Sequence, residues 1–207
     1  MKRFLTLVAL SVVIMAGAQN DEAYVDELTS DFTQKLTERG IDQYFVAKRY
    51  CSGKIEMFQI GREKKLCTSR GTYYEVYVVW KEEEIVRLKK MDNCGLFYSL
   101  ELVNEVLYDL FDSRKSALKS EEVKHYKSAS YTGEPELRKK PQPCFRAFQF
   151  TYGSEQYSKS YNLFDLSNEV EGDNLNYDHN QKLTVVQLDR HLDEILSTSE
   201  AQLRRQL

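Results

Sequence analysis

The sequence lacks the local signatures of the common hydrolases, zinc proteases and nucleotide-binding proteins. Its 207 residues include no G-x-S-x-G, H-E-x-x-H or C-x-x-C motif and no glycine-rich phosphate loop. Histidine is scarce as well, since the chain has three, His125, His179 and His191. Imidazole bases and imidazole metal ligands are therefore few, and no familiar local motif indicates catalysis.

The chain is also poor in proline and in linker-like composition. All three prolines lie within residues 135–143, and no tract rich in glycine and serine interrupts the sequence. Such tracts are typical of flexible links between domains. Because domains usually span about 100–200 residues, we expect residues 19–207 to form a single globular domain.

A long unbroken apolar run occurs once, at the N-terminus. Basic residues at the start precede the apolar segment from Phe4 to Met15, and the small residues Ala16 and Ala18 follow it. The segment is shorter than the roughly 20 residues that cross a bilayer as a helix, whereas the small residues suit cleavage by signal peptidase. The sequence therefore predicts a cleaved secretory signal peptide, residues 1–18, and no membrane span in the mature chain.

An excess of positive charge is absent too. The formal net charge is −3, and loss of the two basic residues of the signal peptide makes the mature chain more negative. The basic side chains occur as pairs and triplets among acidic neighbours. They do not form the segregated basic stripe that binds phosphate backbones, and we expect no nucleic-acid partner.

Cysteine is infrequent but even in number: the chain has Cys51, Cys67, Cys94 and Cys144. In an exported protein, secreted or periplasmic, an even number favours disulfides. Zinc sites use ligands in close pairs, which these spacings do not offer, and free buried thiols are the other alternative. Of the three pairings open to four cysteines, we expect Cys51–Cys67 and Cys94–Cys144. The sequence has no N-x-S/T glycosylation site, which agrees with a bacterial protein.

The chain does have clear helical and strand patterns. Three segments carry apolar residues at helical spacing: residues 22–39, residues 99–118 and the segment from residue 184 onward. Strand patterns occupy residues 55–60 and two hairpins, 72–80 with 85–91 and 145–152 with 156–164. This order predicts an α+β fold, in which an antiparallel sheet of about five strands packs against about three amphipathic helices.

Aromatic residues are plentiful, with 14 tyrosines and 10 phenylalanines. Four tyrosines occupy strand positions that we expect to face away from the helices: Tyr73, Tyr77, Tyr157 and Tyr161. A sheet face lined by tyrosine offers a large, rigid binding surface for a protein, a peptide or a glycan. The alternative interpretation is structural, because cross-strand aromatic pairs stabilise a sheet by roughly 0.2–1 kcal/mol each.

Calcium is the one cofactor that the sequence suggests. Oxygen-bearing side chains, which are potential calcium ligands, occur at every second position: Asn174, Asn176, Asp178 and Asn180. A calcium loop of the EF-hand kind needs a glycine and a glutamate at positions that are His179 and Val185 here. Asparagine-stabilised turns before a helix explain the same residues. We therefore expect no cofactor, with calcium in this loop as the alternative.

These features predict an exported, noncatalytic domain that binds a protein, a peptide or an envelope component. Its binding surface is either the tyrosine-bearing sheet face or the polar segment of residues 119–143. The alternative is a secreted hydrolase that uses paired carboxylates or a Cys-His pair, the latter formed by Cys94 or Cys144 with His179. An oxidised cysteine has no thiolate, so disulfides would remove the Cys-His form of this alternative.

Overall fold

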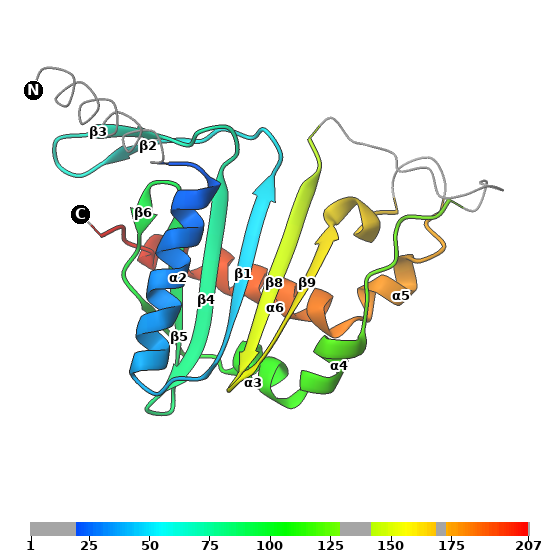
Figure 1. Cartoon of the computed structure of the whole chain (residues 1–207). Helices are drawn as coiled ribbons and strands as arrows, with labels where there is room; N and C mark the ends of the chain where they lie inside the picture. The colour runs from blue at the N-terminus through cyan, green and yellow to red at the C-terminus, as the bar shows by residue number, and fades with distance from the viewer. Residues whose placement is uncertain (1–19, 129–141, 169–172, 207) are drawn as a thin grey trace, which may run out of the picture.

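The computed structural model describes residues 20–128, 142–168 and 173–206 of the chain (Figure 1). The predicted α+β class is confirmed. An antiparallel sheet has the strand order β6-β5-β4-β1-β8-β9, and β7 also pairs with β5. The seven strands are β1 (Gln43–Cys51), β4 (Tyr74–Glu82), β5 (Ile85–Asp92), β6 (Gly95–Leu96), β7 (Leu100–Leu102), β8 (Cys144–Tyr152) and β9 (Glu155–Asn162). Two of them are very short, so the strand count exceeds the predicted five.

A hairpin and several helices surround this sheet (Figure 1). Two further strands, β2 (Met57–Ile60) and β3 (Lys65–Thr68), form a separate two-stranded sheet. The helices of the described residues are α2 (Glu22–Glu38), α3 (Val106–Ser113), α4 (Lys115–Ser120), α5 (Tyr177–Gln181) and α6 (Thr184–Ser199), with short 3-10 turns η1 (Leu163–Leu166) and η2 (Glu200–Gln202). The predicted helices at residues 22–39 and from residue 184 onward correspond to α2 and α6.

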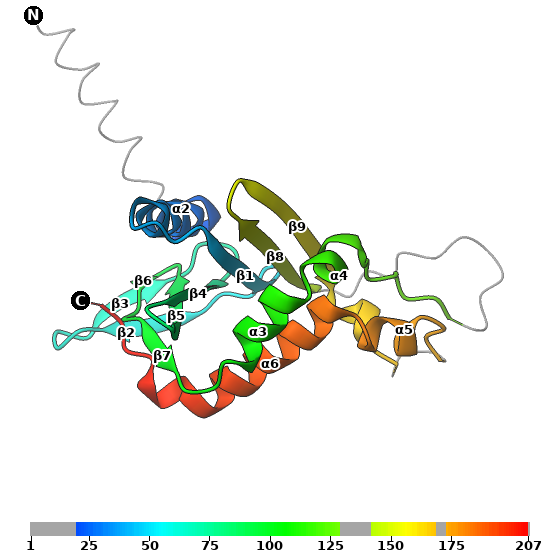
Figure 2. The same ribbon diagram turned by 90° about the horizontal axis from the view of Figure 1, so that it is seen from below.

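Helices lie on both faces of the sheet, which therefore has a core on each side (Figure 2). On one face α2 packs over β4, β5 and β6, where Val25 and Trp80 are buried. On the other face α3 and α6 cover Phe45, Phe150 and Leu188. Because α2 lies over one half of its face, no helix of the described ranges lies above the half formed by β8 and β9 (Figure 2).

Both predicted hairpins are present, and a central strand, β1, joins them into one sheet. β4 pairs with β5 with Val79 opposite Leu88, and β8 pairs with β9 with Phe150 opposite Tyr157. β1 lies between β4 and β8 and was not among the predicted strands. Its residues 44–47 are all buried because both faces are covered, so it lacks the alternation that marks a half-exposed strand.

The helix predicted over residues 99–118 is wrong in its first part. Leu100 instead lies in β7, opposite Leu88 of β5, and α3 begins only at Val106. The side-chain oxygen of Asn104 accepts a hydrogen bond from the Val106 N–H at 2.9 Å, which satisfies one of the free amides at a helix start. The buried Leu102 thus belongs to a strand and not to the predicted helix.

The predicted cysteine pairing is wrong, although all four cysteines form disulfides. Cys51 at the end of β1 faces Cys144 at the start of β8, and these two are bonded. Cys67 of β3 is bonded to Cys94 in the turn after β5. The adjacency of β1 and β8, which the sequence does not reveal, sets the first bond.

The two disulfides are consistent with an oxidising extracellular or periplasmic location. The predicted signal peptide, residues 1–18, lies outside the described residues. Within the three described ranges, no helix combines the length and the apolar composition that crossing a bilayer requires. The chemistry of the cysteines thus supports the export that the N-terminal sequence predicts, while the signal peptide itself stays a prediction.

Candidate groove beside a free edge strand

The described surface contains an open groove between α2 and the uncovered half of the sheet. Its volume is about 630 Å³. One wall is α2, the floor is formed by β1 and β8, and the far side is β9. The half-covered sheet face is thus the physical origin of the groove, because α2 is the one helix on that side of the sheet among the described residues (Figure 2).

The far wall is a row of neutral polar side chains on β9. Gln156, Ser158 and Ser160 lie at alternate positions of this strand and are exposed. The register places Gln149 of β8 opposite Ser158 and Ala147 opposite Ser160. Directly opposed residues share a face of an antiparallel sheet, so these five side chains form one surface of amides, hydroxyls and a methyl group.

The α2 wall and the floor of the groove are also built from small side chains. Thr29, Ser30 and Thr33 face the groove from the helix. The Thr29 hydroxyl donates to the Val25 carbonyl at 2.8 Å, and the Thr33 hydroxyl donates to the Thr29 carbonyl at 3.1 Å. Each of these hydroxyl oxygens keeps lone pairs for another donor. The α2 wall thus offers hydroxyl oxygens as acceptors, and Val46 adds an apolar side chain on the floor.

The charged groups at one end of the groove neutralise one another. Lys48 of β1 donates to Glu22 at 2.7 Å and to Asp26 at 2.8 Å, both on α2. Burial opposes the charge of Lys48, but the hydrogen bonds to Asp26 and Glu22 raise its pKa. The hydrogen bond from Lys48 in turn lowers the pKa of Glu22. This cluster holds α2 against β1 and leaves the rest of the groove without a strong charge.

β9 is also a free edge of the sheet. Among the described residues, it is the last strand in the order and pairs with β8 alone. Within the described residues, no backbone hydrogen bond joins its outer edge to another segment. Lys159 lies on the opposite, helix-covered face, because it is paired with the buried Phe148. An inward-pointing charge on an edge strand is a common protection against indiscriminate pairing, and the groove face of β9 stays neutral.

The four tyrosines proposed as a binding face do not form one. Tyr77 and Tyr161 are buried in the core under α6, and Tyr157 packs against the same core. The Tyr161 hydroxyl donates to Asp189 at 2.9 Å, and the Tyr73 hydroxyl donates to the buried Asp92 at 2.9 Å. The expectation that these tyrosines face away from the helices is wrong, because helices lie on both sides of the sheet.

A buried ionic network that the sequence did not predict contacts these tyrosines. Asp189 of α6 accepts hydrogen bonds from Arg49 of β1, from Arg146 of β8 at 3.1 Å and from Tyr161. Arg49 also donates to Asp193 at 2.5 Å. These contacts tie α6 to two central strands, so we assign them a structural role.

The candidate Cys-His pair is not assembled. All four cysteines lie in disulfides, so the required thiolate is missing. His179 is exposed on α5. His125 Nδ1 lies 3.4 Å from an Asp165 oxygen, and His191 Nδ1 lies 3.0 Å from Glu194. Each histidine is therefore separate from the groove lining and from the cysteines.

The asparagines of the candidate calcium loop hold the backbone together. Asn174 Nδ2 donates to the Asp165 carbonyl at 3.0 Å, and Asn180 Nδ2 donates to the Lys124 carbonyl at 2.8 Å. Asn176 donates to the His125 carbonyl, while Asp178 is exposed. In the described part of the chain, no three histidine, cysteine, aspartate or glutamate side chains form a metal-binding group. The turn-forming role thus accounts for these asparagines.

Comparison with known proteins adds no relative: the sequence matches no protein family, no curated protein and no solved structure.

Proposed function

We propose that this protein is an exported, noncatalytic domain that binds an extended polypeptide along β9. The observation that carries the proposal is the juxtaposition of a free edge strand with a groove of about 630 Å³ on one face of the same strand. An extended segment that pairs with a sheet edge gains main-chain hydrogen bonds, and pockets for its alternate side chains give selectivity. Here β9 supplies the edge and the groove supplies the pocket.

The groove lining favours a polypeptide over a glycan. Sugars are commonly bound against exposed aromatic rings, whereas the tyrosine of this groove, Tyr44, is buried. The row of Gln156, Ser158 and Ser160 repeats every second residue, which is also the side-chain period of an added strand. Amides and hydroxyls provide both donors and acceptors, so the row suits polar side chains of a bound segment.

Two further observations support a binding role in an exported protein. The disulfides suit a secreted or periplasmic protein. They also remove the thiol nucleophile of the alternative hydrolase, whose other form, with paired carboxylates, has no specific observation in its favour. An envelope protein with an extended segment is the partner class that this combination suits.

A peptide-display selection on the immobilised protein tests the proposal. We expect enrichment of peptides without proline at their centre, since a strand that pairs needs its amides. Ser158→Arg fills the groove and should weaken binding of the selected peptides at least tenfold. Ser197→Arg, the same change on the exposed surface of α6, should leave binding unchanged. Selection of no peptide family, or equal binding to both variants, would refute the proposal.

A further inference from the structure

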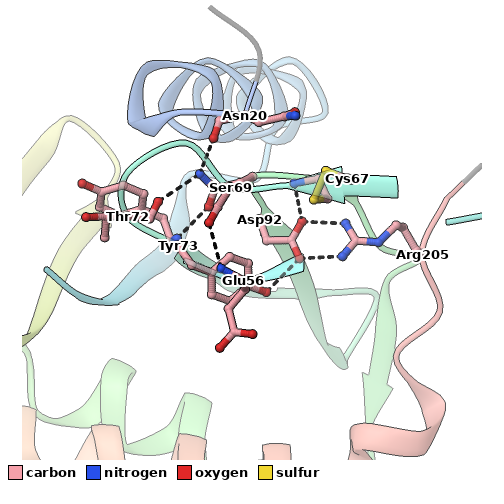
Figure 3. The surroundings of a disulfide bond; sticks show 11 residues. Asn20, Glu56, Cys67, Ser69, Thr72, Tyr73, Asp92 and Arg205 are labelled. Carbon is pink, nitrogen blue, oxygen red and sulfur yellow. Dashed lines mark hydrogen bonds and ion pairs between the residues drawn. A yellow bond between two sulfur atoms is a disulfide. The ribbon is translucent and has the colours of Figure 1, made fainter. Parts of the chain in front are cut away.

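The β2–β3 hairpin projects from the sheet as a separate element (Figure 1). Its base is firmly held (Figure 3). Cys67 is bonded to Cys94, and the Glu56 N–H donates to the Ser69 hydroxyl at 3.0 Å. Close to the disulfide, Arg205 donates two hydrogen bonds, of 2.5 and 2.6 Å, to the buried Asp92. The hairpin therefore leaves the body of the protein in one fixed direction.

One face of this hairpin carries uncovered apolar side chains. The register sets Met57 opposite Thr68 and Gln59 opposite Leu66, so Met57 and Leu66 share a face. Their side chains are 59% and 58% exposed, and Ile55, two residues before Met57, is 58% exposed. The opposite face is packed, with the ring of Phe58 5.3 Å from that of Tyr73.

The tip of the hairpin is basic. Arg62, Lys64 and Lys65 lie in or beside the turn, and all three are exposed. Within the described residues, none of them forms an ion pair, and Glu63 is the one acidic residue between them. Since the whole chain has a net charge of −3, this hairpin concentrates positive charge on a protein that is otherwise acidic.

We propose that the β2–β3 hairpin docks on an anionic phospholipid surface, with Ile55, Met57 and Leu66 at the boundary of the acyl chains. Apolar side chains flanked by lysine and arginine bind such surfaces through burial and attraction together. Lysine is depleted at protein–protein interfaces, and the strip is narrow, so a bilayer fits better than a protein. This site does not depend on the groove beside β9.

The start of the described chain lies at the same end of the molecule. The Asn20 carbonyl accepts hydrogen bonds from the Arg70 N–H and from Asn93 Nδ2, both at 2.8 Å and both at the base of the hairpin (Figure 3). The described chain thus begins beside the hairpin, so a bilayer that contacts the hairpin would lie close to Asn20.

Sedimentation with lipid vesicles tests this inference on the mature chain. We expect binding to vesicles that contain phosphatidylglycerol, at least tenfold weaker binding to pure phosphatidylcholine, and loss at high salt. Met57→Ser with Leu66→Ser should weaken binding at least tenfold. Replacing Arg62, Lys64 and Lys65 by glutamine should do the same. Val103→Ser with Val106→Ser, which removes exposed apolar residues elsewhere, should have no effect.

A fluorescence variant provides a second readout. The single tryptophan, Trp80, is buried, so Leu66→Trp adds one exposed indole whose emission should shift to the blue on anionic vesicles. Absence of binding to these vesicles would overturn the inference. Binding that the Met57 and Leu66 changes leave intact, or a hairpin that binds protein partners but no vesicles, would overturn it equally.

Discussion

At the scale of single residues, the contacts whose loss costs most free energy of folding are those of buried charges. The side chains of Arg49 and Asp189 are 8% and 7% exposed and form an ion pair. Arg49 also pairs with Asp193, whose side chain is 57% exposed. A buried charge that loses its partner is costly, whereas an exposed pair contributes little. One guanidinium therefore has two carboxylate partners of unequal importance.

The two aspartates provide a matched test of this inequality. Asp189→Asn removes the buried negative charge and should lower the free energy of unfolding by about 3–5 kcal/mol. Asp193→Asn makes the same chemical change at an exposed position and should cost about 0–1 kcal/mol. Urea unfolding of the two variants measures both values. Equal losses would show that burial does not govern this network.

At the scale of elements, the disulfides differ in the length of chain that they close. Cys51–Cys144 joins residues 93 positions apart, and Cys67–Cys94 joins residues 27 positions apart. In the chain-entropy model the longer loop stabilises the fold by about 4–5 kcal/mol and the shorter by about 3–4 kcal/mol. The bond between β1 and β8 should thus matter more to the sheet, and the other mainly to the hairpin.

Paired alanine substitutions separate these contributions. Replacement of Cys51 and Cys144 should lower the free energy of unfolding more than replacement of Cys67 and Cys94 does. The buried Trp80 lies in the sheet, so its fluorescence during guanidinium unfolding follows the main core in both variants. A greater loss from the hairpin disulfide would contradict the loop-length argument.

The elements that the sequence predicted correctly are those whose pattern is local. α2 and β9 have an exposed face, so their periodicity is visible. β4 is almost wholly buried, and its run of β-branched and aromatic residues marks it as a strand. β1 is buried on both sides, so no alternation marks it. β7 and α3 divide one apolar stretch between strand and helix because β5 offers an edge to pair with. Disulfide connectivity depends on strand order, which local patterns do not contain.

The candidate site was missed for a related reason. Gln156, Ser158 and Ser160 alternate visibly with Tyr157 and Tyr161 in the sequence. The sequence predicts the tyrosine row as the binding face because aromatic residues are enriched at many interfaces. The position of α2 across the sheet decides which row is exposed, and local sequence patterns do not reveal that position. The row of Gln156, Ser158 and Ser160 is therefore identified as a groove wall only from the fold.

At the scale of the whole molecule, the tyrosines govern the behaviour at high pH. Burial raises the pKa of Tyr74 and of Tyr108 to about 12 each. Burial also raises the pKa of Tyr73, Tyr77 and Tyr161 beyond the usual range. In the unfolded chain these phenols ionise near pH 10, so the folded state holds them protonated at higher pH than the unfolded state does.

Stability should accordingly fall in alkali. A raised pKa contributes stability that is complete below about pH 10 and is lost as pH rises through the folded value. The tyrosinate absorbance that belongs to these buried tyrosines should therefore appear late, above about pH 11, and together with loss of structure in circular dichroism. Complete development of the tyrosinate absorbance near pH 10 with the fold intact would contradict this prediction.

The central claim is that an extended polypeptide pairs with β9 beside the groove. Hydrogen exchange of the protein with and without a display-selected peptide tests it most directly. We expect slower exchange of the outward-facing amides within Glu155–Asn162, smaller changes in α2, and no change in the β2–β3 hairpin. Protection confined to the face under α3 and α6, with β9 unchanged, would contradict the claim and place the binding surface elsewhere.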